Sequence, residues 1–131
     1  MTELPFFVYG TLRPGEYNHD RFLLGRTARE EPARLAGALL YDGPGYPYAV
    51  PGEGVVAGDL VTAAPGAYAE LLGVLDRVEL PAGYERADRE VVRVRDGATV
   101  GAWVWFAAPG TRHGPLIRGG DWRARPGPRT S

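Results

Sequence analysis

The chain has 131 residues, about the size of one compact domain, and a formal net charge of −1, which does not favour binding of a polyanion by the molecule as a whole. It contains no cysteine or lysine and its one serine is Ser131, so disulfides, thiolate nucleophiles and Schiff-base lysines are excluded and a serine triad is not expected. His19 and His113 are the only histidines, and without cysteine they are too few for a typical zinc site. Any chemistry must therefore rest on carboxylates, tyrosines, arginines, threonines or backbone groups.

Glycines and prolines divide the chain into short apolar runs, which favour a loop-rich domain with many short strands. The first run predicts a buried strand over residues 4–9, stopped by Gly10. A polar turn region follows, and then a short apolar helix or turn at residues 22–24. Two further runs predict strands over residues 34–41 and 55–61.

The clearest helix signal covers residues 65–78, where apolar side chains recur at steps of three and four residues. Pro65 suits the first helical turn, because the N–H that proline lacks has no partner there. Two strands, at residues 84–95 and 99–106, are predicted to form a hairpin across the Asp96-Gly97 turn. Strands, one central helix and a hairpin together predict an α+β domain whose sheet closes partly into a barrel.

The C-terminal part, residues 112–131, has five arginines against a single acid, Asp121. We expect an ordered excursion at residues 117–122 followed by a loose, solvated tail. These arginines could also hold a phosphate or an anionic part of a substrate. We expect the whole chain, 1–131, to be a single domain.

No apolar run approaches the roughly 20 residues of a transmembrane helix. The first residues also lack the basic segment and apolar stretch of a secretion signal. We therefore expect a soluble, cytoplasmic protein with no membrane partner.

The stretch FVYGTLRPGEYNH, residues 7–19, is the first candidate for a binding site. A strand that ends in Tyr9, Gly10, Thr11 and Leu12 leaves consecutive backbone N–H groups without ladder partners. Gly10 would let a ligand approach the backbone closely, and such a turn can bind a carboxylate or a carbonyl oxygen. An ordinary turn after a strand would give the same pattern.

Glu79 is the first candidate for acid–base chemistry, because its spacing places it on the same helical face as Leu72 and Leu75. Burial and the negative end of the helix dipole would both raise its pKa toward neutrality. A helix that ends one residue earlier would instead direct Glu79 to solvent. Asp59, inside an apolar run, is either a second functional carboxylate or a satisfied structural one. The two histidines lie in polar loops and are not expected to be catalytic.

Five segments occur in the order and spacing typical of one family: FVYGTLRPGEYNH, LYDGPGYP, VAGDL, LDRVELPAGYERADREVVRV and AWVW. On these motifs the chain resembles the γ-glutamylcyclotransferase-like family, which includes the AIG2-like proteins and the γ-glutamylamine cyclotransferases. The resemblance covers residues 6–106, and the combination of Tyr-Gly-Thr-Leu with LDxxE…YxR is its most specific part. The ending IRGGDWR is similar to bacterial members that release γ-glutamyl groups during antibiotic biosynthesis.

The resemblance implies a small barrel of mixed strands with flanking helices and a pocket between the first loop and the glutamate. It also implies a reaction in which the α-amine of a γ-glutamyl group attacks its own γ-carbonyl, giving 5-oxoproline and a released amine. That reaction requires no metal and no cofactor. By position, Glu79 would be the catalytic acid/base. The substrate-binding residues that the resemblance implies are Tyr9, Gly10, Thr11, Leu12, Asn18, Tyr84 and Arg86, of which the last two would line or brace the pocket.

Three points stay open. The family often has Gly-Glu-Leu where this chain has Gly58-Asp59-Leu60, so the resemblance assigns no role to Asp59. A non-catalytic module that binds a small molecule would keep the same pocket. An interaction protein could use the basic C-terminus on nucleic acid, although the near-neutral overall charge disfavours this and we expect no nucleic-acid partner.

Overall fold

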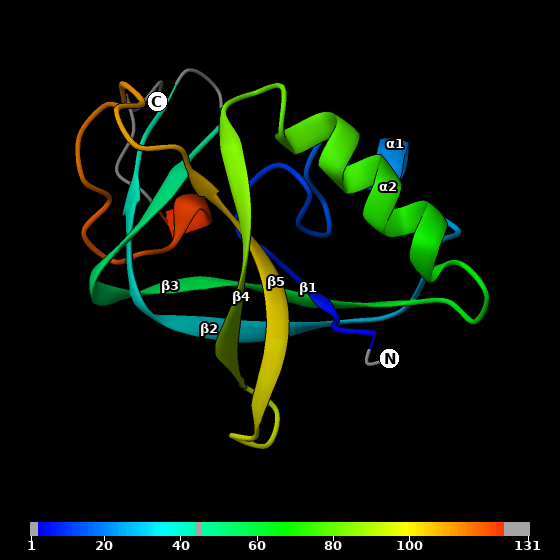
Figure 1. Ribbon diagram of the computed structural model, residues 1–131. Coiled ribbons are helices and arrows are strands. Elements are labelled where there is room, and N and C mark those ends of the chain that lie inside the picture. Colours follow the sequence, from blue (N-terminus) through cyan, green and yellow to red (C-terminus); the bar gives the residue numbers. More distant parts are fainter. Residues whose placement is uncertain (1–2, 44–45, 125–131) are drawn as a thin grey trace, which may run out of the picture.

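The computed structural model describes residues 3–43 and 46–124. Within these ranges five strands close into a barrel, and two α-helices and a short 3-10 helix, η1, complete the fold (Figure 1). In chain order the elements are β1 (Phe6–Val8), α1 (His19–Phe22), β2 (Thr27–Tyr41), β3 (Tyr48–Ala63), α2 (Tyr68–Glu79), β4 (Tyr84–Arg93), β5 (Thr99–Ala107) and η1 (Trp122–Ala124). The tail expected at the end of the chain, residues 125–131 with Arg125 and Arg129, lies outside the described residues.

The barrel is mixed because β1 is parallel to one neighbour and antiparallel to the other. β1 pairs antiparallel with β3 and parallel with β5, whereas the β3–β2, β2–β4 and β4–β5 pairs are all antiparallel. The strand order around the barrel is β1-β3-β2-β4-β5. This arrangement confirms the predicted α+β class and the mixed-strand barrel with flanking helices.

Strands β2 and β3 contain 15 and 16 residues, about twice the lengths that the apolar runs predict. The glycines and prolines that signal loops in the sequence are accommodated inside these strands. In β2 a register shift between Ala36 and Ala38 takes up Gly37, whose φ of +82° suits glycine. Buried positions alternate up to Leu35 and resume at Ala38, so the bulge restores the inward-facing phase.

Helix α2 begins three residues later than predicted, so the expectation that Pro65 occupies its first turn is wrong. Gly66 has a φ of +78°, which is not helical, so the helix cannot include Pro65, and Ala67 is the N-cap of α2. At the other end the helix includes Glu79. Leu71 and Leu75 are fully buried, in agreement with the predicted apolar stripe.

Strand β5 is covered on both faces, because the barrel interior takes one and α2 takes the other. Val104 lies in the core. On the opposite face, the indole N–H of Trp103 donates to the hydroxyl of Tyr68, and that of Trp105 donates to Oδ1 of Asp76, each at 3.0 Å. These contacts hold α2 against the barrel and fix where its C-terminal end lies.

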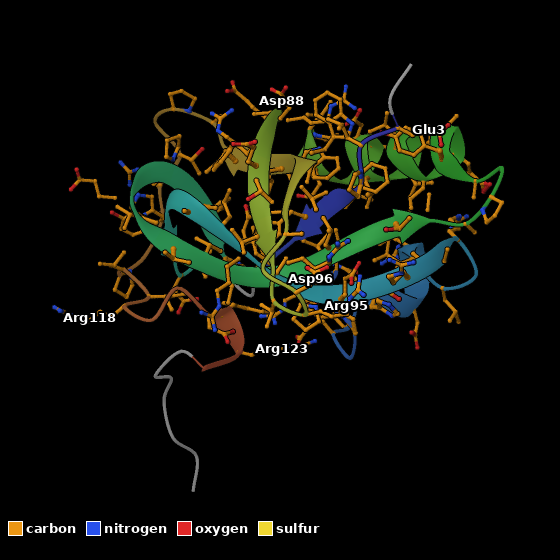
Figure 2. All side chains as sticks on the ribbon, turned by 90° about the horizontal axis from the view of Figure 1, so that it is seen from below. Glu3, Asp88, Arg95, Asp96, Arg118 and Arg123 are labelled. Atoms are coloured by element: carbon orange, nitrogen blue, oxygen red, sulfur yellow. The ribbon has the colours of Figure 1, made fainter. Side chains whose placement is uncertain are left out.

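The segment after β5 returns to the barrel at residues 117–122, the stretch over which the sequence predicts an excursion. The N–H of Ile117 donates to the carbonyl of Leu40 at 2.8 Å, and the side chains of Ile117 and Trp122 are buried. Arg118, in contrast, is exposed and extends away from the ribbon (Figure 2). Over the described residues, each helix is too short or too polar to span a membrane.

Candidate active site

A cavity of about 220 Å³ lies between the loop that follows β1 and the C-terminal end of α2. Its walls come from β1 and the loop after it, the residues just before β3, the end of α2 and the turn after it, and one residue each of β4 and β5. The lining residues are Phe7, Val8, Tyr9, Gly10, Thr11, Leu12, Tyr17, Asn18, Tyr46, Pro47, Val78, Glu79, Ala82, Tyr84 and Trp105. The sequence predicts eight site residues, and seven of them line this cavity; Arg86 does not.

The loop that carries Gly10 to Asn18 is shaped by hydrogen bonds within itself. The N–H of Asn18 donates to the carbonyl of Thr11 at 3.1 Å, and its side-chain Nδ2 donates to Oγ1 of Thr11 at 2.9 Å. A Cβ at Gly10 would lie 2.7 Å from Cδ of Pro47, so only glycine fits against the opposite wall. Asn18 therefore holds the loop closed, and Gly10 lets the loop backbone approach Pro47.

The backbone N–H groups of Gly10, Thr11 and Leu12 belong to this wall. Over residues 3–43 and 46–124, none of these three N–H groups has a backbone acceptor. Backbone donors without an internal partner are suited to an anionic or carbonyl oxygen of a ligand. The sequence also predicts exposed backbone donors at this turn, and their use in binding a ligand stays a prediction.

Glu79 is the last residue of α2, and the helix extends far enough to place its half-buried side chain in the pocket lining. The alternative in which Glu79 points to solvent is therefore not the one that the structure adopts. Burial raises the pKa of Glu79 to about 7. Within the described part of the chain, no ion pair and no hydrogen bond to the carboxylate offsets that burial. A carboxyl group of this kind can accept and return a proton near neutral pH.

Tyr9 and Tyr84 line the pocket, but their hydroxyl groups bind the protein backbone. The hydroxyl of Tyr9 donates to the carbonyl of Trp105 at 2.6 Å and accepts from the N–H of Ala49 at 3.2 Å. The hydroxyl of Tyr84 donates to the carbonyl of Pro47 at 2.7 Å. Burial raises the pKa of both phenols far above the ordinary value, so both stay protonated. The two tyrosines brace the wall formed by residues 47–49 and present their rings to the cavity.

Arg86 does not line the pocket. Its Nη1 lies 3.4 Å from Oδ2 of Asp76, and its guanidinium lies 4.5 Å from the ring centre of Trp103, on the side of β5 that α2 covers. The substrate contact expected for Arg86 is therefore not supported by its position. Its contacts brace α2, because the same Asp76 carboxylate accepts the indole N–H of Trp105, a pocket residue.

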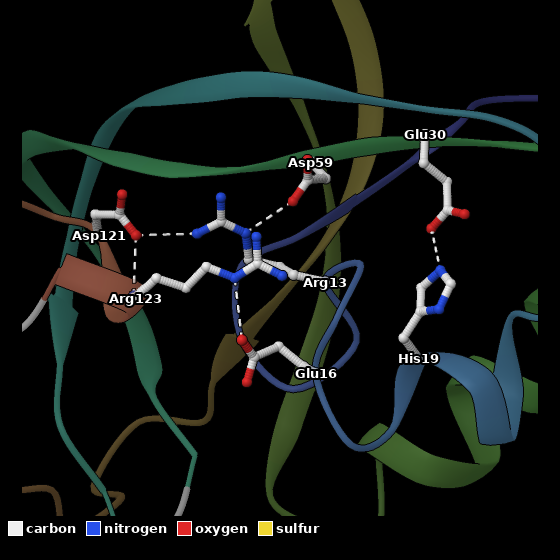
Figure 3. A network of polar contacts seen from close by, with 7 residues as sticks. All are labelled: Arg13, Glu16, His19, Glu30, Asp59, Asp121 and Arg123. Atoms are coloured by element: carbon white, nitrogen blue, oxygen red, sulfur yellow. Dashed lines mark hydrogen bonds and ion pairs between the residues drawn. The ribbon is translucent and has the colours of Figure 1, made fainter.

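Asp59 and the histidines also lie outside the pocket lining. Asp59 is buried and accepts from Nε of Arg13 at 2.7 Å (Figure 3), so it is a paired structural carboxylate. His19 contacts Oε1 of Glu30 at 2.6 Å. Burial opposes the charged form of His19, but hydrogen bonds to Asp20 and Glu30 raise its pKa above the ordinary value. The ring of His113 lies 4.0 Å from that of Tyr41, on the surface.

Several residues that line the cavity are not among the site residues predicted from the sequence, and they are mostly apolar or aromatic. Tyr46 and Pro47 belong to the LYDGPGYP segment, which signals a turn but gives no sign that the turn forms a pocket wall. The sequence places Trp105 with a second tryptophan on one face of a strand. It does not show that this face packs against α2, because that contact depends on the tertiary structure. In the described residues, no group of three or more histidine, aspartate or glutamate side chains is placed to hold a metal ion.

Comparison with known proteins places the chain in a family. The model of the family "Gamma-glutamyl cyclotransferase, AIG2-like" matches residues 6–124. The gamma-L-glutamyl-butirosin B gamma-glutamyl cyclotransferase of Niallia circulans is 43% identical over 53 residues, which are 40% of this chain and 33% of that protein. The matched stretch therefore spans only a third of that curated relative.

Two solved structures extend the likeness to the whole fold. An uncharacterized protein from Pyrococcus horikoshii has a TM-score of 0.67 and 28% identity, covering 91% of this chain and 89% of its own. An AIG2-like protein from Mus musculus has a TM-score of 0.65 and 24% identity, covering 98% and 97%, a likeness that concerns the fold alone. Because the family model matches most of the sequence, the chain belongs to the AIG2-like gamma-glutamyl cyclotransferase family.

Proposed function

We propose that the chain is a γ-glutamyl cyclotransferase that converts a γ-glutamyl amide into 5-oxoproline and a released amine. The observation that carries the proposal is the Glu79 carboxyl group, which lies in the pocket opposite the loop of residues 9–12 with a pKa of about 7. Membership of the family and the partial match to the Niallia circulans enzyme support the same activity.

The reaction needs no nucleophile from the protein, because both reacting groups belong to the substrate. The α-amine nitrogen of the glutamyl group forms a bond to its own γ-carbonyl carbon, and the bond from that carbon to the leaving nitrogen breaks. A bound conformation that brings these two atoms together can lower the barrier by up to about 7–11 kcal/mol. The absence of cysteine and lysine from the chain is compatible with this chemistry.

Glu79 is proposed to move one proton across this reaction. As a carboxylate it takes a proton from the substrate ammonium group, which makes the amine nucleophilic. As the neutral acid it returns that proton to the leaving nitrogen when the carbon–nitrogen bond breaks. The attacking nitrogen loses its second proton on becoming the lactam N–H, and that proton reaches the released amine through solvent. A pKa of about 7 suits both steps, because neither protonation state of Glu79 is then strongly disfavoured near neutral pH.

The loop of residues 9–12 is proposed to bind the glutamyl group and the oxygen that becomes negative during attack. Among the described residues that line the pocket, Glu79 alone is charged. Substrate oxygens must therefore be held by neutral donors, and the N–H groups of Gly10, Thr11 and Leu12 are available for this. Donors of this kind can contribute about 2.7–4 kcal/mol each to the stabilisation of a developing oxyanion.

The test is release of 5-oxoproline from a panel of γ-glutamyl amines, γ-glutamyl dipeptides and γ-glutamylated natural products, which also identifies the preferred amine. Glu79→Gln should stay folded and lose turnover by about 10²–10⁴-fold, the usual contribution of a positioned acid/base. Glu70→Gln is the matched control, because Glu70 lies exposed on the same helix and pairs with Arg26 at 3.2 Å, outside the pocket. It should keep full activity.

Two outcomes would contradict the proposal. A fully active Glu79→Gln enzyme would remove Glu79 from the reaction. Thermal stabilisation by 5-oxoproline or a γ-glutamyl amide, without product from any substrate in the panel, would instead identify a binding module of the same fold.

A further inference from the structure

Arg13 lies in the middle of the loop of residues 10–18, and its side chain is buried, 9% exposed. Its Nε donates to Oδ2 of Asp59 at 2.7 Å, and its Nη1 donates to Oδ1 of Asp121 at 3.0 Å (Figure 3). Asp59 belongs to β3, and Asp121 belongs to the segment of residues 117–124, which we call the C-terminal segment. One guanidinium group thus joins three parts of the chain that are far apart in sequence.

The C-terminal segment is held firmly enough to place Asp121. The N–H of Ala57 donates to the carbonyl of Gly120 at 2.7 Å, which fixes the segment to β3. Gly120 has a φ of +69°, and a Cβ there would collide with the carbonyl oxygen of Val55. The residue before Asp121 therefore has to be glycine for the segment to pack against β3 in this way.

On the loop side, the backbone of Arg13 takes part in two consecutive turns. Its N–H donates to the carbonyl of Gly10 at 3.1 Å, and its carbonyl accepts from the N–H of Glu16 at 2.9 Å. The first of these turns contains Thr11 and Leu12, which line the pocket, whereas Arg13 itself does not. Any restraint on the Arg13 side chain is therefore passed through the backbone to the residues that face the substrate.

The charge balance shows why the restraint is strong. An arginine stays charged in proteins, and a buried charge is stable only when it is paired and hydrogen-bonded. The guanidinium can donate to two carboxylates at once in a fixed plane, which an ammonium group on a flexible stem cannot reproduce. A second ion pair, from Nε of Arg123 to Oε2 of Glu16 at 3.0 Å, ties the same segment to the same loop (Figure 3).

We propose that Arg13 is a positioning residue for substrate binding, and that Asp59 and the C-terminal segment serve the active site by holding it in place. This inference rests on the proposed function, because it assigns the residues that set the geometry of the same pocket. It gives the C-terminal arginine-rich part of the chain a role in the site through Asp121, with no contact between that segment and substrate.

The test uses the Asp121→Asn variant of the full chain, which keeps the size of the side chain and leaves the Asp59 contact in place. KM for the best γ-glutamyl substrate should rise about ten-fold, the order expected when a binding group is displaced by a fraction of an ångström. The midpoint of the pH dependence of kcat/KM should not move, because Glu79 does not contact Arg13 or Asp121. Amide hydrogen exchange over residues 9–13 should become faster than in the wild type. Arg13→Lys should show the same changes to a larger degree.

Asp96→Asn is the matched control, because it also breaks an arginine–aspartate pair, with Arg93 at 2.8 Å, but in the β4–β5 turn (Figure 2). It should lower the melting temperature and leave KM and the exchange of residues 9–13 unchanged. If Asp121→Asn leaves KM or the amide exchange of residues 9–13 unchanged, the positioning role is refuted, even if the melting temperature of this variant falls. If the wild type releases no 5-oxoproline, the proposed function fails. The amide exchange of residues 9–13 is then the only measurement that shows whether Arg13 positions this loop.

Discussion

The Glu79→Gln substitution should make the folded protein more stable above pH 7, although it removes the proposed catalytic group. Burial raises the pKa of Glu79 from 4.5 to about 7, and in the unfolded chain the group titrates near its ordinary value. Between these two pH values the folded protein holds a proton that the unfolded chain has lost, so the free energy of unfolding falls as the pH rises. The span of about 2.5 pH units, at about 1.4 kcal/mol per unit, amounts to about 3 kcal/mol.

The measurement is urea-induced unfolding of the wild type, Glu79→Gln and Glu70→Gln from about pH 4 to about pH 9. At the acid end Glu79 is protonated in both the folded and the unfolded state, so the glutamine variant and the wild type should have similar stabilities. The advantage of Glu79→Gln should then grow between about pH 4.5 and about pH 7 and level off at about 3 kcal/mol. Glu70→Gln should show no such increase, because Glu70 is exposed.

A stability difference between wild type and Glu79→Gln that does not change with pH would refute this reasoning. It would mean that the Glu79 carboxylate in the folded protein is as well solvated, or as well paired, as in the unfolded chain. The proton transfer assigned to Glu79 would then lose its physical basis, because the pKa near neutrality follows from the same burial.

Individual contacts lead to three further predictions. The kcat/KM of the wild type should rise with pH through about 7, because the carboxylate form of Glu79 is the proposed proton acceptor; a profile that is flat from pH 6 to pH 8 would contradict this. His19→Gln should cost more stability at about pH 5 than at about pH 9, as measured by urea unfolding. The raised pKa of His19 stabilises the fold below its ordinary value of 6.5, and this contribution is lost as the pH rises through the folded-state value. Tyr84→Phe should lower the free energy of unfolding by about 1–3 kcal/mol, because the buried carbonyl of Pro47 loses its donor; an unchanged urea midpoint would contradict that bond.

The parts of the fold and site that could be predicted depend on local pattern. The spacing of Leu72, Leu75 and Glu79 is a property of one helix, so the position of Glu79 on its apolar face follows from the sequence. The turn at Asp96-Gly97 is likewise local, and the structure confirms it with a φ of +72° at Gly97. Gly10 follows a buried strand, and this alone indicates a turn that could expose backbone donors.

The parts that could not be predicted depend on which distant segments meet. Nothing in the apolar run around Asp59 indicates that its partner is Arg13, 46 residues earlier, or that Asp121 shares that partner. The same holds for Arg86, which the family motif places near the pocket but which the packing of α2 directs to Asp76. The lengths of β2 and β3 were underestimated because glycine and proline usually end strands, whereas a bulge and long-range pairing accommodate them here.

The chemistry of the pocket depends on how its neighbours use their hydrogen bonds. A carboxylate at the C-terminal end of a helix and partly buried is unfavourable, and a nearby hydroxyl donor would normally stabilise it and lower its pKa. The two tyrosines of the pocket do not do so, because Tyr9 donates to the carbonyl of Trp105 and Tyr84 donates to the carbonyl of Pro47. The same bonds that fix the pocket walls therefore leave Glu79 with a pKa near neutrality. Rigidity of the walls and basicity of the carboxylate are thus two consequences of one arrangement, and a Tyr84→Phe enzyme should keep the pH midpoint of the wild type while it loses stability.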